Sequence, residues 1–232
     1  MPIDFEPKRQ QSLFSPAADR NKEPIGEVLK DRLPKSGVLL EIACGALQHA
    51  SHLAPRHPDL IWQPSDINSE AIAHGRAIPL TGNIREPIYL DVLDDSWPIT
   101  SANVIYSANL MHISPPGVPS ALFRGAQKIG VSDVFIYGPF IVTGHPTAEG
   151  NVRFDADLRN RNPDWGIREL SKIEAAAALS DFRMIDSVTM PANNLFLHFT
   201  CVASISQSTV SVETKQPENN RKTTENKKGA RS

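Results

Sequence analysis

Short apolar runs recur along the middle of the chain, and each is followed by polar or turn residues and then by enough sequence for a helix. The runs span residues 37–42, 60–62, 88–90, 104–106 and 134–137. Parallel strands need crossover connections of this length, whereas hairpins do not. Right-handed crossovers join such strands into one layer. The alternation therefore predicts an α/β, doubly wound, mostly parallel sheet of the Rossmann-like kind.

The C-terminal part of the apolar sequence has a different pattern. A helical stretch at 171–179 is followed by apolar runs at 182–190 and 195–203, with the turn PANN between them. Two runs joined by a tight turn indicate an antiparallel hairpin. Near the other end, Ile25, Val28, Leu29 and Leu33 have helical spacing, and Pro34 stops that pattern.

Composition sets the domain boundaries and excludes several classes of function. The chain has 232 residues, 40% of them hydrophobic and 22% charged, which suits one main domain. We expect a loose segment at 1–16, a domain at 17–205 and a disordered polar tail at 206–232. A net charge of -2, two cysteines and no long apolar run favour a cytoplasmic protein whose partner is a small molecule, not nucleic acid or a membrane. The oligomeric state is left open.

Acidic residues follow the first three predicted strands. Glu41, Asp66 and Asp91 stand at the ends of these strands. Ligands of open α/β sheets bind beyond the carboxyl ends of the strands, and Asp66 follows Gly45 by about 20 residues, the offset of an acid that binds a ribose diol. Each carboxylate alone could equally cap a helix or face water. Their common position favours a site for ribose and adenine.

The loop ACGALQH after the first strand distinguishes between cofactors. Its one glycine, Gly45, makes a poor pyrophosphate cradle, which disfavours an NAD-dependent oxidoreductase. S-adenosyl-L-methionine (SAM) has no phosphate and needs only one close backbone approach, an acid for the ribose and an apolar slot for adenine. We predict that SAM is bound by Glu41, Ala43, Gly45, Asp66, Ile67, Asp91, Val92 and Asn109.

Seven segments together resemble one family in order and spacing. They are EIACGALQHASHLA, WQPSD, YLDV, SANLMHISP, YGPF, NVRFDADLRNRNPDWGIREL and MPANN. The chain is similar over residues 17–200 to the methyltransferase-like 26 family of class I SAM-dependent methyltransferase-like proteins. The resemblance implies a seven-stranded sheet and SAM as ligand, but no substrate. Family members usually have glycine where this chain has Leu47. That side chain either crowds the methionine part of SAM or turns into the core, and we expect the core.

Two candidate catalytic residues follow the fourth and fifth strands. His112 in SANLMHISP is a candidate general base, or else it bonds a loop carbonyl and orders the turn at Pro115. Tyr137 is the second candidate, with simple packing as the alternative. The segment 140–170 is long for a connection, and we interpret it as a lid or substrate loop. Its candidate substrate residues are Arg159, Arg161, Trp165 and Arg168, which either reach an anionic substrate or form a network with aspartates.

We therefore expect a SAM-dependent methyltransferase that acts on a small molecule, with specialised metabolism as the suggested setting and the acceptor atom open. The alternative is a cofactor-free methyltransferase-like scaffold or regulatory binding protein, which Leu47 favours. His49 and His52 lie one helical turn apart without a third ligand nearby, so no metal site is predicted.

Overall fold

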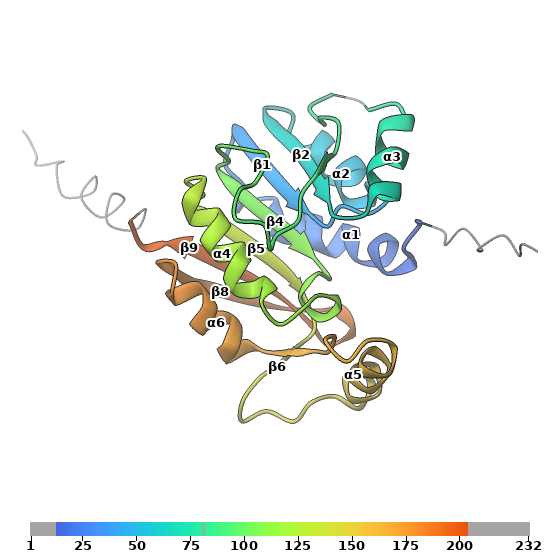
Figure 1. Ribbon diagram of the computed structural model, residues 1–232, viewed down its shortest axis with the longest axis vertical. Helices are drawn as coiled ribbons and strands as arrows, with labels where there is room; N and C mark the ends of the chain where they lie inside the picture. The colour runs from blue at the N-terminus through green and yellow to red at the C-terminus, as the bar shows by residue number, and fades with distance from the viewer. Residues whose placement is uncertain (1–12, 81, 204–232) are drawn as a thin grey trace, which may run out of the picture.

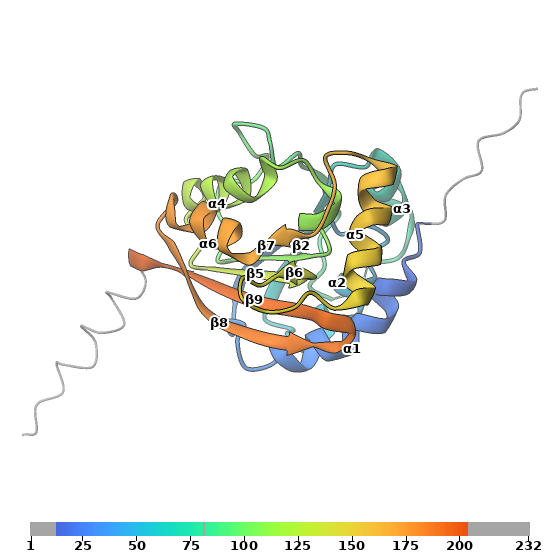
Figure 2. The same ribbon diagram turned by 90° about the horizontal axis from the view of Figure 1, so that it is seen from below.

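A computed structural model describes residues 13–80 and 82–203 of the chain (Figure 1). The predicted tail at 206–232 and positions 1–12 of the predicted loose segment lie outside the described residues. The described part forms a central sheet with helices on both faces (Figures 1 and 2).

The central sheet has seven strands in the order β3-β2-β1-β4-β5-β9-β8. The first five are mutually parallel, and β9 runs antiparallel to both β5 and β8. The predicted fold class, the strand number and the C-terminal hairpin are thereby confirmed. The strands are β1 Gly37–Ile42, β2 Leu60–Asp66, β3 Ile88–Tyr89, β4 Val104–Ala108, β5 Asp133–Gly138, β8 Phe182–Met190 and β9 Asn194–Cys201.

Two hydrophobic clusters cover the two faces of this sheet. One joins the sheet to α4 and α6, and the other joins it to α1 and α2, as the side view in Figure 2 also shows. The order of the strands reverses between β1 and β4. The connections that follow these two strands therefore lead to opposite faces of the sheet and leave a crevice between them. The helices of the domain are α1 Pro16–Leu29, α2 Gln48–Leu53, α3 Ser69–Ala77, α4 Val118–Lys128, α5 Glu149–Arg161 and α6 Leu170–Ala178, with short 3₁₀ turns η1 Ala54–Arg56, η2 Met111–Ile113 and η3 Pro191–Asn193.

The N-terminal helix begins earlier than its apolar pattern predicts. The Ser15 side chain accepts a hydrogen bond from the Ala18 backbone N–H, and Pro16 occupies the first turn, where its missing N–H costs nothing. The Gln48 side chain also bonds the backbone N–H and C=O of Ser15. Ser15 and Pro16 are therefore fixed against α2, and the helix ends at Leu29 rather than Leu33.

The segment 140–168 is not the long loop that the sequence suggests. It contains β6 (Phe140–Ile141) and the 13-residue α5, and it leads into β7 (Arg168–Glu169). β6 and β7 pair in parallel as a separate two-stranded sheet. The polar sequence of α5 hid this helix, because few of its residues face the core.

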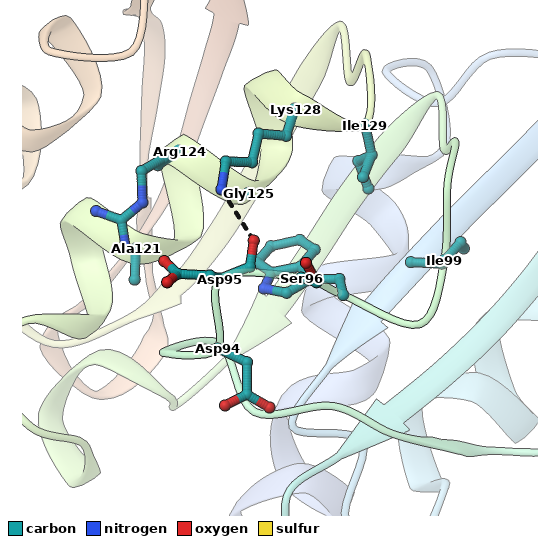
Figure 3. Close-up of a pocket in the computed structure, with 10 residues that line it drawn as sticks. Asp94, Asp95, Ser96, Ile99, Ala121, Arg124, Gly125, Lys128 and Ile129 are labelled. Atoms are coloured by element: carbon teal, nitrogen blue, oxygen red, sulfur yellow. Dashed lines mark hydrogen bonds between the residues drawn. The ribbon is translucent and has the colours of Figure 1, made fainter.

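A cavity of about 190 Å³ lies at the C-terminal end of α4, away from the crevice (Figure 3). Asp94, Asp95 and Ser96 line one wall, and Lys128 donates to the Asp95 carbonyl at 2.9 Å. The Trp97 ring packs so closely on Gly125 that a Cβ atom there would lie 2.1 Å from it. The cavity is thus a gap in the packing between the β3–β4 connection and α4.

Candidate functional site

The loop after β1 has left-handed backbone at alternate residues. The φ angles are 63° at Ala43, 53° at Gly45 and 61° at Leu47. Such angles suit glycine and cost a residue with a side chain about 1 kcal/mol. A Cβ atom placed on Gly45 would meet no atom of the described part of the chain within 4 Å, so this backbone is open for close approach by a ligand.

Leu47 turns away from the crevice. Its side chain is fully buried in the cluster on the α1 and α2 face, and its Cδ1 atom lies 3.0 Å from the position of a Cβ built on Gly75. This confirms the expectation that Leu47 faces the core. The left-handed backbone that a glycine usually adopts is kept here by a leucine, because burial of the side chain offsets the strain.

Asp66 ends β2 at the floor of the crevice. Its Oδ2 atom accepts from the Gly45 backbone N–H at 2.9 Å, and its Oδ1 atom accepts from the Asn68 N–H at 2.8 Å. Each carboxylate oxygen has two lone pairs, so both can still accept a further hydrogen bond. The carboxylate is therefore oriented in advance and joins the loop after β1 to the end of β2.

A cavity of about 160 Å³ lies beside Asp66, at the carboxyl ends of β1, β2, β3 and β4. Its walls are mainly apolar, and a purine ring needs such a slot. Five of the residues predicted to bind SAM line it: Ala43, Asp66, Ile67, Asp91 and Val92. The remaining lining residues are Ile42, Leu90, Leu93, Leu110, Ile113, Ser114, Pro115 and Val118.

Glu41 lies elsewhere than predicted. It is 1% exposed and points into the core, where Trp62 Nε1 donates to its Oε2 atom at 2.6 Å. Burial, helped by the charge of Asp66, raises the pKa of the Glu41 carboxyl to about 8. The structure thus corrects the prediction that Glu41 lines the cofactor crevice: it belongs to a buried polar network beneath the loop.

Several polar residues that sequence reasoning missed belong to this network. His49 Nε2 donates to Asn21 Oδ1 at 2.7 Å, and His49 Nδ1 lies 3.2 Å from the Tyr106 hydroxyl. Burial lowers the pKa of His49 to about 4. Tyr137 faces the same side of the sheet, where burial raises the pKa of its phenol while Asn21 and the charge of Arg20 oppose that rise. Tyr137 therefore points toward α1. Its partners there, Asn21 and Arg20, are polar residues that the apolar spacing of the helix did not indicate.

His112 lies in η2, the 3₁₀ turn after β4. The turn places Leu110 and Ile113 in the wall of the cavity, while the His112 ring contacts Phe154 of α5 at 5.3 Å between ring centres. His112 is 5% exposed, and its Nδ1 atom has no hydrogen-bond partner among the described residues. Burial, and then the charge of Arg168, lower the pKa of His112 to about 4. The imidazole is therefore neutral at neutral pH.

Asn109 precedes that turn and is the last residue of the predicted cofactor set. Its φ angle is 62°, and its backbone N–H donates to the Tyr137 carbonyl at 2.8 Å. This bond ties the end of β4 to the end of β5. Asn109 does not line the apolar cavity, although the next residue, Leu110, does.

Arg168 braces the His112 turn. Its guanidinium donates to the backbone carbonyls of Met111, Ser114 and Asp164. The Gly166 N–H also donates to the His112 carbonyl at 3.0 Å. The half-buried guanidinium of Arg168 uses its N–H groups to bind three backbone carbonyls. Arg168 therefore holds the backbone that carries His112.

The other candidate substrate residues lie on or beside α5, and each arginine there has an acidic partner one turn earlier. Arg159 binds Asp155 at 2.8 Å, and Arg161 lies 3.8 Å from Asp157. The Arg161 guanidinium also stacks on the Trp165 ring at 5.1 Å. Arg159 and Arg168 both line a third cavity, of about 480 Å³, with Lys172, which pairs with Glu169 at 2.8 Å.

Within residues 13–80 and 82–203, no helix is both long and apolar enough to cross a membrane. The same ranges contain no group of three or more His, Cys, Asp or Glu side chains arranged to hold a metal ion. His52 instead lies 2.8 Å from Glu23 of α1.

Solved structures resemble this chain in fold. CalO1, a methyltransferase in calicheamicin biosynthesis in its SAH-bound form, has a TM-score of 0.64 at 13% identity, over 80% of this chain and 54% of that one. Human N-acetylserotonin methyltransferase in complex with SAM gives 0.63 at 12%, over 79% and 55%. The mitomycin 7-O-methyltransferase MmcR gives 0.64 at 14%, over 78% and 54%. This chain thus spans about half the length of these structures.

The likeness to these structures establishes the class I methyltransferase fold. At this identity it carries the fold alone. A family model described as "Protein of unknown function (DUF938)" matches residues 12–201, which is most of the chain. The match includes the loop after β1, Asp66, the His112 turn and α5. The chain therefore belongs to the DUF938 family, and its fold is that of the class I SAM-dependent methyltransferases.

Proposed function

We propose that this protein is a SAM-dependent methyltransferase that acts on a small molecule. The observation that carries the proposal is the apolar cavity beside Asp66, at the point where the strand order reverses. A class I fold with a purine-sized slot next to an oriented acid suits an adenosine moiety. The open backbone at Gly45 suits the remaining part of such a ligand.

Within this proposal, the side chains and open backbone of the crevice suit the groups of SAM in their chemistry. Asp66 would bind the ribose hydroxyls through the free lone pairs of its oxygens. Ile67, Val92 and Ile113 would enclose the adenine, and Asp91 would reach its edge. Ala43 and Gly45 would contact the ligand through their backbone. We do not assign Glu41 to this set, because its carboxyl is bound to Trp62.

SAM supplies a methyl group on a positively charged sulfur, which a nucleophile attacks in line. In our proposal His112 accepts a hydrogen bond from the O–H or N–H of the acceptor and so orients its lone pair. A neutral imidazole with a pKa of about 4 is a weak base. The acceptor proton becomes strongly acidic as the new bond to carbon forms, so a weak base is sufficient to take it. His112 would then hold the proton of the acceptor as an imidazolium.

The proposed family and the proposed metabolic setting depend on sequence motifs more than on the solved structures. The motifs RNPDWGIR and MPANN support membership of the methyltransferase-like 26 family. Two of the similar structures, CalO1 and MmcR, are a methyltransferase in calicheamicin biosynthesis and a mitomycin 7-O-methyltransferase, which is consistent with specialised metabolism as the setting. A cytoplasmic location and the absence of a nucleic-acid partner stay predictions from composition. The cofactor-free alternative loses its main support, because Leu47 lies in the core.

The test is a calorimetric titration of the full chain with SAM, with NAD as a control ligand. We expect saturable binding of SAM, no binding of NAD, and competition from adenosine, since the adenine and ribose contacts carry the recognition. Failure of the folded protein to bind SAM would contradict the proposal and return the cofactor-free alternative. Asp66→Ala, discussed below, tests whether binding occurs in the crevice.

A further inference from the structure

The unpartnered Nδ1 atom of His112 is costly in this fold. A buried acceptor without a hydrogen bond costs about 1–3 kcal/mol, and folded proteins usually satisfy such atoms. The position of a Cβ built on Gly138 lies 3.6 Å from this Nδ1, at van der Waals contact, so this nitrogen lies against the end of β5. His112 is thus held ready to accept a hydrogen bond that the described part of the chain does not provide.

An aromatic side chain packs against the imidazole ring that carries this nitrogen. Phe154 contacts the His112 ring with an angle of 67° between the two planes, an edge-to-face arrangement. Phe154 is itself 37% exposed, so its ring closes the site from the solvent side. A planar aromatic group therefore already fits against His112, and a ligand ring that replaced it would keep the same contact.

The helix that carries Phe154 has the connections of a lid. Gly144 before α5 has a φ of 81° and Gly166 after it has a φ of 145°, and these backbone angles are available mainly to glycine. Lids are commonly hinged at a few such positions. α5 is attached to the rest of the domain by few buried residues, among them Asn151, which donates to the Asn193 carbonyl at 3.1 Å.

The charges on α5 are balanced along the helix itself. Arg153, Arg159 and Arg161 pair with Glu149, Asp155 and Asp157 respectively, and Arg168 is bound to carbonyls. An anionic ligand would therefore compete with a carboxylate for each of the three arginines of α5. The neutral imidazole of His112, by contrast, has a buried nitrogen without a partner among the described residues.

From these observations we infer that the acceptor substrate is a neutral aromatic alcohol or amine that binds in place of the Phe154 ring and donates its O–H or N–H to His112 Nδ1. The inference rests on the proposed function and names the substrate class of the same site. It replaces the expectation of an anionic substrate held by the arginines of residues 140–170. Phe154 acts as the cover of the acceptor site in the ligand-free protein.

The first experiment compares matched probes on full-length protein labelled with ¹⁵N-histidine, in the presence of SAH. Phenol is the neutral donor, anisole lacks the donor, and benzoate carries a negative charge. We expect phenol to shift the His112 Nδ1 resonance saturably. Anisole should bind about fivefold more weakly, because one hydrogen bond of about 1 kcal/mol is lost. Tighter binding of benzoate than of phenol, or no shift with phenol, would overturn the inference.

The second experiment tests the cover with two neighbouring substitutions. Phe154→Ala should tighten phenol binding several-fold, because it removes the competing ring. Val152→Ala is the matched control, since Val152 is also an exposed apolar residue of α5 at 54% exposure. Unchanged or weaker phenol binding in Phe154→Ala would reject Phe154 as the cover. His112→Phe should abolish the difference between phenol and anisole, with thermal unfolding to verify that each variant is folded.

The outcomes separate this inference from the proposed function. Binding of SAM in calorimetry together with no binding of phenol would overturn the substrate class and leave the methyltransferase proposal intact. Absence of SAM binding would contradict the methyltransferase proposal whatever the phenol result.

Discussion

The two ends of the crevice are built in different ways. At the cofactor end, Asp66 and the loop after β1 are fixed by backbone hydrogen bonds and by Leu47, which anchors the loop in the core. At the acceptor end, His112 has no partner for its Nδ1 atom among residues 13–80 and 82–203, and its ring packs on Phe154 of α5, a helix with few buried residues.

The contrast suggests that the cofactor end is set by the fold, whereas the acceptor end is set by a few replaceable side chains. Mutations at the cofactor end should change stability or the affinity for SAM. Mutations at the acceptor end should change the affinity for the acceptor substrate. The predictions below test that division.

The largest expected effect is at Leu47. Leu47→Ala deletes a fully buried side chain and should lower the free energy of unfolding by about 2–5 kcal/mol. Leu47→Gly should cost about 1 kcal/mol less than Leu47→Ala, because glycine adopts a φ of 61° without strain. Urea unfolding measures both. SAM affinity of the folded variants should be unchanged, and tighter binding in either would mean that Leu47 obstructs the crevice.

Arg168 tests the brace of the acceptor end. Arg168→Ala leaves the carbonyls of Met111, Ser114 and Asp164 without their donor and should destabilise the protein by about 3 kcal/mol. Phenol binding should weaken while SAM affinity changes little. Arg153→Ala is the control, because Arg153 is exposed and its pair with Glu149 spans 3.5 Å. Equal losses of SAM and phenol affinity would show that the two ends are not separately built.

Asp66 tests the cofactor end directly. Asp66→Ala should weaken SAM binding by about 1–3 kcal/mol, since ribose hydroxyls would lose a charged acceptor. Asp66→Asn, which retains one carbonyl oxygen, should lose less. The matched control is Asp94→Ala, an exposed acid in the cavity of Figure 3. Calorimetry on folded variants provides the comparison, and unaltered affinity in Asp66→Ala would place Asp66 outside the binding site.

The buried titratable groups predict a stability maximum near pH 6.5. Above this pH, Glu41 (pKa about 8) keeps its proton in the folded state and has lost it in the unfolded state. Stability should therefore fall as the pH rises to 8, by about 1.4 kcal/mol per pH unit. Below pH 6.5, His49 and His112 (pKa about 4) are neutral when folded and protonated when unfolded. The unfolded state then gains two protons at these histidines, whereas the folded state keeps one extra proton at Glu41. Stability therefore falls again toward pH 4.5.

Glu41→Gln isolates the alkaline branch of this curve. Glutamine keeps an oxygen for the Trp62 N–H but does not titrate, so the loss of stability between pH 6.5 and 8 should disappear. The substitution of exposed Glu27 by Gln controls for the change in net charge. Persistence of the alkaline slope in Glu41→Gln would assign it to another group.

The fold was predictable because its information is local. The run 37–42 coincides with β1, and the run 182–190 coincides with β8, since apolar strands bounded by turn residues are legible without knowledge of their partners. Asp66 was predictable for a related reason: it ends a strand at a spacing that the fold imposes. The helix α5 was missed, because its few inward-facing residues leave no apolar stripe.

The direction of single side chains was less legible. Glu41 and Leu39 point to the same face of β1, because side chains alternate along a strand. Both faces of β1 are buried, so no alternation of polar and apolar residues shows whether Glu41 faces the core or the crevice. Its partner Trp62 is 21 positions away. The acceptors of Arg168 are backbone carbonyls, which no residue type reveals. Partners such as Asn21 become visible only once α1 is packed against α2.

The turn η2 serves both ends of the crevice at once. Ile113 lines the cavity next to Asp66, and His112, one residue earlier, faces Phe154. Occupancy on one side that shifts this turn must alter affinity on the other side, and thermodynamic linkage makes the factor equal in both directions. If the position of the turn that suits one ligand also suits the other, each ligand binds more tightly when the other is already bound. A three-residue turn would then be sufficient to make the two binding events cooperative.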